Sequence, residues 1–162
     1  MSHEPRLARA LRELLAVRRV AALGTLDAAA PTQPFVSMVP FAVDPARRAL
    51  VLHVSGLAAH TRNLQAQPAV SLLVTAGEVK GEPVHALPRV TIDGTARLLE
   101  PGSAEAEAAR AAYLARFPEA EPMTQLGDFR FVLVTPTGAR QVAGFGAARS
   151  VDAEELATAL GA

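Results

Sequence analysis

The residues best suited to chemistry lie in one short segment, where a small-residue turn leads into a predicted helix. Ser55 ends an apolar, strand-like run. The first turn of the helix that follows carries four polar side chains: His60, Thr61, Arg62 and Asn63. Free backbone N–H groups and a partial positive charge make a helix N-terminus an anion site, and these side chains suit a phosphate. The alternative is that Thr61 and Asn63 only cap and solvate an ordinary helix.

The remaining candidates for chemistry form no catalytic or metal-binding motif. The chain has no cysteine, which excludes disulfides, thiolate-bound metals and cysteine nucleophiles. It also contains no H-E-x-x-H zinc pattern, no G-x-S-x-G nucleophile elbow and no Walker A loop. We therefore predict no metal site and name no catalytic residue.

Two other polar residues each have two interpretations. His53 alternates with Leu52 and Val54, which is more typical of a hydrogen-bonded histidine inside a strand than of a ligand. Arg89 opens a predicted strand after Pro88. A solvated surface arginine is the ordinary interpretation there, and a ligand contact is the other.

Composition restricts the class of protein. With 162 residues and 16.9 kDa, the chain suits a single domain over residues 1–162. Sixteen basic residues balance sixteen acidic ones, so charge gives no reason to expect nucleic acid or an anionic membrane as a partner. No apolar run reaches the roughly 20 residues of a membrane span, and the N-terminus lacks the apolar core of a signal peptide. We expect a cytoplasmic protein.

Hydrophobic periodicity predicts a mainly β protein of the α+β type, with helices at its periphery. The strand-like segments are 20–26, 34–44, 49–56, 69–77, 89–100 and 128–147. The predicted helices are an amphipathic one over 5–18, then 58–67, 103–117 and a short C-terminal one over 152–160. Hairpin connections rather than strand–helix–strand units favour an antiparallel barrel or sandwich.

Prolines and glycines mark special points in these strands. Pro40 has no N–H to donate, so we expect it at a sheet edge or a bulge. Gly94 suggests a bend or bulge, and the Pro-Thr-Gly at 136–138 suggests a turn between two final strands. The segment 69–77 has no polar alternation, so both of its faces are expected to be covered.

Three motifs stand in a recognisable order: S-x-L-A-x-H-T-x-N-L at 55–64, P-x-V-S-L-L at 68–73 and G-F-G-x-A at 144–148. Together with the flanking strands, they resemble the pyridoxamine 5′-phosphate oxidase-like superfamily over residues 7 to 150. The nearest likeness is to its haem-utilisation branch. The resemblance implies an antiparallel split β-barrel of the FMN-binding type.

The resemblance further implies a homodimer with two FMN sites at the subunit interface, and an oxidoreductase acting on a small or planar substrate. The flavin ring would lie along Ser37, Met38, Val39 and Pro40. The phosphate would lie near Ser55, His60, Thr61 and Arg62, with Asn63 in the same helical turn. Arg89 matches a position where the oxidases carry a flavin-contacting glutamine.

The sequence also departs from the oxidases. The oxidases hold the phosphate with cations that include an S-R-K turn, which reads Ala58, Ala59 and His60 here, and the closing arginine–histidine substrate motif is absent. The alternative prediction is a haem-binding or haem-degrading protein in which His53, His60 or Arg89 contacts iron or a propionate. Members of the haem branch draw an iron-ligating histidine from a C-terminal extension, and no histidine follows His85 here. A second alternative is a non-catalytic flavin-binding module.

Overall fold

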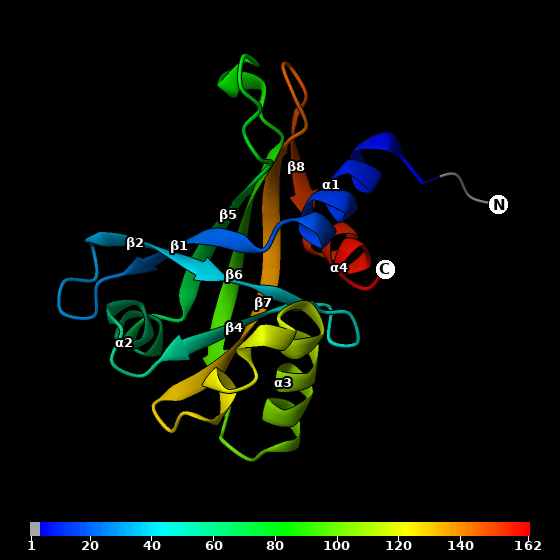
Figure 1. Cartoon of the computed structure of the whole chain (residues 1–162). Helices are drawn as coiled ribbons and strands as arrows, with labels where there is room; N and C mark the ends of the chain where they lie inside the picture. The colour runs from blue at the N-terminus through cyan, green and yellow to red at the C-terminus, as the bar shows by residue number, and fades with distance from the viewer. Residues whose placement is uncertain (1–3) are drawn as a thin grey trace.

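Within residues 4–162, which the computed structural model describes, the strands form one antiparallel sheet of eight (Figure 1). His3 lies outside the described residues. The strands are β1 (Val20–Leu26), β2 (Pro34–Pro40), β3 (Ala42–Asp44), β4 (Ala49–Ser55), β5 (Ala69–Thr75), β6 (Arg89–Leu98), β7 (Phe129–Val142) and β8 (Ala148–Asp152). Their order is β2-β1-β5-β6-β7-β4-β3, and β8 pairs with the end of β7. The predicted antiparallel split barrel is confirmed.

The two ends of this strand order are joined by the chain itself, which curls the sheet. β2 and β3 are the end strands, yet only Phe41 separates them in sequence. Phe41 is fully buried, and its N–H donates to the carbonyl of Arg19 at 3.0 Å. The single strand predicted over 34–44 is therefore two strands, because β2 pairs with β1 while β3 forms the hairpin with β4. Pro40 ends the edge strand β2, as expected.

Four α-helices surround the barrel within the described part of the chain (Figure 1). They are α1 (Arg6–Val17), α2 (Ala59–Ala66), α3 (Ala104–Arg116) and α4 (Ala153–Leu160), and the single-turn 3₁₀ helices are Val84–Ala86, Pro118–Ala120 and Met123–Gln125. Ser103 caps α3 and Asp152 caps α4, each accepting a backbone N–H with its side chain. None of these helices has the length and apolarity needed to cross a membrane. The cytoplasmic location stays a prediction.

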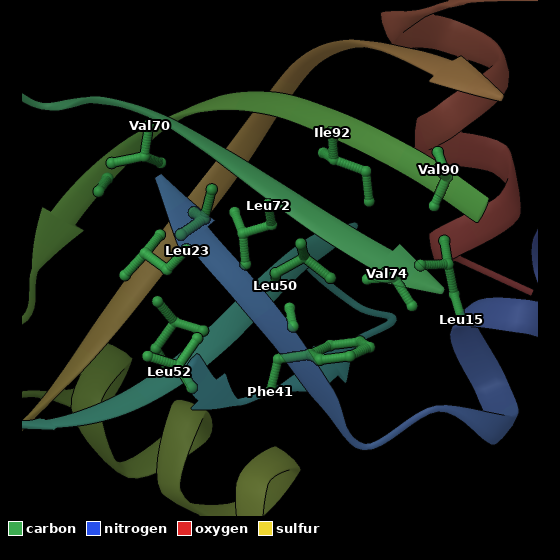
Figure 2. Close-up of a cluster of buried hydrophobic side chains, with 14 of the residues drawn as sticks. Leu15, Leu23, Phe41, Leu50, Leu52, Val70, Leu72, Val74, Val90 and Ile92 are labelled. Atoms are coloured by element: carbon green, nitrogen blue, oxygen red, sulfur yellow. The ribbon is translucent and has the colours of Figure 1, made fainter. Parts of the chain in front are cut away.

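The main core fills the inside of the curled sheet. Alternate residues of the strands point inward, and Figure 2 shows Leu23, Leu50, Leu72 and Ile92 converging from four different strands. Leu11 and Leu15 of α1, with Leu156 and Leu160 of α4, close one end; all four are buried. Burial of this apolar surface is the main stabilising term for the fold, at about 25 cal/mol per Å².

A second, smaller core lies between α3 and the opposite side of β4 and β7. It contains His53, whose ring lies 4.5 Å from that of Phe131, 5.0 Å from Phe129 and 5.6 Å from Tyr113, centroid to centroid. His53 is only 7% exposed, and its Nδ1 is buried without a hydrogen-bond partner. The prediction of a strand histidine with satisfied hydrogen bonds is therefore wrong in that respect. His53 packs as an aromatic side chain.

The predicted turn at 136–138 is also wrong, because β7 runs straight through it. The register between β6 and β7 shifts there: Asp93 pairs with Gly138, but Gly94 pairs with Pro136. A bulge thus absorbs the extra residue, and the proline lies where no ladder N–H is needed. Gly94 is required at this point, since a Cβ would lie 2.8 Å from the carbonyl oxygen of Thr135. The bulge predicted at Gly94 is confirmed.

Within residues 4–162, no layer of the chain covers the outer face of β2, β1 and β5. Met38, Ala22 and Leu73 lie side by side in register across these three strands. Met38 is 66% exposed and Leu73 is 37% exposed, and Val36 next along β2 is 67% exposed. The expectation that both faces of 69–77 are covered is wrong for this chain alone, because the helix on the outside of the sheet, α3, packs over β3, β4 and β7 and not over β5. We call this surface, defined by Val36, Met38, Ala22 and Leu73, the outer face.

His53 makes the stability of the second core depend on pH. Burial lowers the pKa of His53 below its ordinary value, so protonation favours the unfolded chain. The stabilisation is complete above the unfolded pKa, near 6.5, and is lost as pH falls from there toward the folded pKa. Each unit by which the folded pKa is depressed costs the wild type about 1.4 kcal/mol of unfolding free energy at low pH. We expect His53→Leu to abolish this loss, because leucine does not titrate.

Urea unfolding at pH 7.5 and pH 5.0 measures this effect. The matched control is His85→Leu, since His85 is exposed on a loop and should leave the pH dependence unchanged. If His53→Leu and the wild type lose the same unfolding free energy between pH 7.5 and pH 5.0, His53 is not the source of the pH dependence.

Candidate functional site

A histidine and a serine from distant segments meet where β2 passes the N-terminal turn of α2. His60 is the second residue of α2, and Ser37 lies at the middle of β2. The Ser37 Oγ and the His60 Nδ1 lie 3.0 Å apart, within hydrogen-bond distance. Both side chains are partly buried. Of the ten predicted site residues, these two have side chains that contact each other across elements far apart in sequence.

Asn63 holds α2 in the position that makes this contact. Its side chain is 4% exposed. Its Nδ2 donates to the Oγ1 of Thr25 at the end of β1, at 3.0 Å, and its Oδ1 accepts from the N–H of Ala28, at 2.9 Å. The amide therefore joins α2 to the β1–β2 hairpin that carries Ser37. Asn63 therefore positions the site, and both its amide nitrogen and its amide oxygen are hydrogen-bonded within the chain.

The two hydroxyls predicted to bind phosphate have partners inside the chain. Thr61 is buried, and its Oγ1 donates to the carbonyl of Ser55 at 2.6 Å. Ser55 Oγ donates to a carboxylate oxygen of Asp128 at 3.2 Å and accepts the N–H of Leu57 at 3.1 Å. These bonds fix the turn between β4 and α2.

The two arginines do not converge on the Ser37–His60 pair. Arg62 is exposed and turns back to donate to the carbonyl of Leu57, at 3.1 Å. Arg62 follows His60 by two positions, and two positions on an α-helix turn the side chain by about 200° around the helix axis. Arg62 therefore leaves α2 on the side away from His60. Arg89 begins β6, which is separated from β2 by β1 and β5, and it donates to the carbonyl of Leu87 at 3.0 Å. Arg89 therefore lies apart from the rest of the predicted set.

The remaining predicted residues divide between the two faces of β2. Val39 is buried in the main core, on the same face as Ser37, and Met38 belongs to the outer face. Pro40 is half-buried where the strand ends. Because β2 is an edge strand that pairs only with β1, its other edge offers backbone groups to a ligand or a partner.

The Ser37–His60 pair has the electrostatics of a neutral donor–acceptor site. Burial lowers the pKa of His60, so the imidazole is uncharged at neutral pH. No residue of the described chain bonds its Nε2. A neutral imidazole with one nitrogen anchored and the other free can accept a proton or coordinate a metal. The residue types at 55–64 indicated His60, but nothing in the sequence indicated that Ser37, 23 positions away, would lie against it.

A sizeable depression lies elsewhere in the described part of the chain. Its volume is about 510 Å³, and it opens beside the bulge at Gly94, between β1, β5 and β6. Ser71 and Asp93 meet in it, with the serine Oγ donating to a carboxylate oxygen at 2.5 Å. None of the predicted site residues lines this depression. It opens on the same side of the sheet as the outer face, since Ser71 and Leu73 point to one side of β5.

A curled antiparallel sheet with its end strands joined at Phe41 defines a split β-barrel domain. The family model described as pyridoxamine 5′-phosphate oxidase matches residues 7–143. The chain belongs to that family, as its motifs predicted.

Three proteins that are at least 30% identical to this chain are named for haem. The heme oxygenase HutZ of Vibrio cholerae is 30% identical over 93% of this chain and 84% of its own length. A chloroplastic heme oxygenase of Arabidopsis thaliana, HOZ, is 38% identical over 68% of this chain but only 32% of its own length. A solved structure described as a heme binding protein from Mycobacterium smegmatis superposes with a TM-score of 0.83 and 31% identity, over 97% of this chain and 62% of that one. The chain thus spans part of the plant and mycobacterial proteins.

The leading prediction of an FMN-dependent oxidoreductase is wrong. The named relatives that are at least 30% identical to this chain are described as haem oxygenases or haem-binding proteins. In the structure, the Thr61 hydroxyl bonds the Ser55 carbonyl, and the Asn63 amide bonds Thr25 and Ala28, so these groups have partners inside the chain. The haem alternative fits the relatives better.

The Asn63 amide should be the main determinant of local stability at this site. We expect Asn63→Ala to lower the free energy of unfolding by about 1–3 kcal/mol, because it leaves the Ala28 N–H without an acceptor in a partly buried position. Chemical denaturation measures the change. Gln65→Ala is the matched control, since it removes an exposed amide from the same helix and should be neutral. Equal effects of the two substitutions would remove the role assigned to Asn63.

Proposed function

We propose that the protein binds haem at the surface formed by β2 and the first turn of α2, as the substrate of an oxidative ring opening. Dioxygen and an external electron donor would be the co-reactants. The observation that carries this proposal is the similarity to the Vibrio haem oxygenase over 93% of the chain. The neutral, anchored imidazole of His60 adds chemical support, since imidazole is a common protein ligand of haem iron.

The surroundings of His60 suit the rest of a porphyrin. Phe35 lies two residues from Ser37 on the same face of β2 and is partly exposed. Leu57, in the turn before α2, is one of the most exposed apolar side chains of the described chain. Such apolar side chains beside the imidazole would contact the flat face of the ring.

We also propose that the working form is a homodimer that associates through the outer face. This face places exposed methionine, valine and leucine side chains side by side on strands, and a stable monomer rarely leaves such a row in water. β2 contributes one side chain to each of the two surfaces. Met38 belongs to the outer face, and Ser37 belongs to the proposed haem surface. A partner bound at the outer face would therefore lie next to the proposed haem surface.

Titration of the purified protein with haemin tests the proposed function. We expect a saturable Soret band with one haem bound per chain, because a defined surface has a limited number of sites. Ascorbate in air should then bleach this band and release iron, which a ferrous-iron chelator detects. Protoporphyrin IX without iron is the control, and it should bind more weakly, since only the apolar contacts remain.

Two results would go against the proposal. A Soret change that rises linearly with haemin and never saturates would indicate adsorption and remove haem binding. Saturable binding with no bleaching by ascorbate and air would leave a haem carrier and remove the ring-opening reaction.

The dimer is tested by a charge on the outer face. We expect the wild type to sediment at twice 16.9 kDa and Met38→Glu to sediment as a monomer, because a carboxylate would be buried at the interface. Leu126→Glu is the control, since Leu126 is an equally apolar, exposed residue after the third 3₁₀ helix and off this face. A monomeric wild type, or a dimeric Met38→Glu, would refute the proposed interface.

A further inference from the structure

The haem proposal leaves open which side chain would coordinate the iron. The sequence contains four histidines and no cysteine, and three of the histidines, His53, His60 and His85, are described by the structure. Their surroundings differ enough to separate them.

Burial excludes His53 as a ligand. Its ring is packed among Phe129, Phe131 and Tyr113 beneath α3, and only 7% of the residue is exposed. A porphyrin would have to displace α3 from the sheet to bring iron to either ring nitrogen. The second core would then lose its apolar contacts.

His85 is a poor candidate for the iron ligand because no hydrogen bond orients its ring in the described chain. It lies on the single-turn 3₁₀ helix Val84–Ala86, in the exposed connection between β5 and β6. Within residues 4–162, no hydrogen bond or ring contact fixes the orientation of its imidazole. Its backbone carbonyl accepts a hydrogen bond from Arg89. A metal-bound histidine is almost always oriented by a hydrogen bond from its second nitrogen.

His60 has the arrangement that a metal-bound histidine requires. Its Nδ1 lies 3.0 Å from the Ser37 Oγ, and its Nε2 has no partner in the described chain. When Nδ1 donates to the serine oxygen, the lone pair must be on Nε2, so the hydrogen bond and metal coordination select the same tautomer. The serine thus holds the ring orientation before any ligand arrives.

The backbone that carries the two residues is also held in place. α2 is fixed to the β1–β2 hairpin by Asn63, one turn after His60, and to the end of β4 by the bond from Thr61 to the Ser55 carbonyl. A ligand position on a helix held at two points is more exact than one on a loop.

Resting on the proposed function, we propose that His60 coordinates the haem iron through Nε2, and that Ser37 positions it through Nδ1. His60 is the ligand in this assignment. Ser37 touches neither iron nor porphyrin and acts only through the imidazole.

Optical and resonance Raman spectra of haemin complexes test both roles. We expect His60→Ala to lose the histidine-ligated Soret and visible bands and to bind haemin at least tenfold more weakly, and added imidazole to restore the bands. His60→Gln keeps a side chain able to bond Ser37 but offers no imidazole, so it should lose the same bands with the fold intact. Ser37→Ala should keep the ligation, weaken binding about tenfold, and lower the iron–histidine stretching frequency of the ferrous complex.

His85→Ala is the matched control and should leave the spectra unchanged. If the wild type binds haemin saturably and both His60 variants keep its spectrum, His60 is not the ligand, although the proposed function stands. If the wild type does not bind haemin at all, the proposed function itself fails. If Ser37→Ala leaves the iron–histidine frequency unchanged, the positioning role of Ser37 is refuted while the ligand role of His60 remains.

Discussion

The site depends on one buried amide. Asn63 gives its Nδ2 hydrogen to Thr25 and takes the N–H of Ala28, so an eight-residue helix is tied to a hairpin more than thirty positions earlier in the chain. A helix of about two turns is marginal by itself and needs tertiary contacts to persist. Buried Leu64 and buried Thr61 supply the others. Without these contacts, nothing would hold His60 against Ser37.

The barrel imposes a second constraint, at the joint between β2 and β3. Phe41 is buried there, and the guanidinium of Arg116 lies 5.2 Å from its ring. The same guanidinium donates to the carbonyls of Leu15 and Ala16, in the last turn of α1, and of Arg18, just after the helix. Burial lowers the pKa of Arg116, although it stays charged because an arginine pKa starts so high. One cation from α3 thus bonds carbonyls at the end of α1 and packs on Phe41, at the joint between β2 and β3.

β2 has different roles on its two faces, and this links the proposed haem surface to the proposed dimer. Its inward residues run from the core at Val39 to the site at Ser37, while Val36 and Met38 form part of the outer face. Because side chains alternate along a strand, a shift of one residue in the pairing of β2 with β1 would exchange these roles. The pairing from Val20 with Pro40 to Leu26 with Pro34 therefore fixes both surfaces together.

The sequence by itself determined the features that depend on neighbours in the chain. Helix caps at Ser103 and Asp152, the edge position of Pro40 and the bulge at Gly94 follow from local chemistry, and the ordered motifs at 55–64, 68–73 and 144–148 indicated the family. Tertiary structure decided what depends on distant neighbours. Only the register of β7 on β6 shows that residues 136–138 continue a strand, and only packing shows that His53 lies among aromatic rings. The pairing of Ser37 with His60 is of the same kind, since a hydrogen bond between residues 23 positions apart leaves no periodicity or spacing to detect.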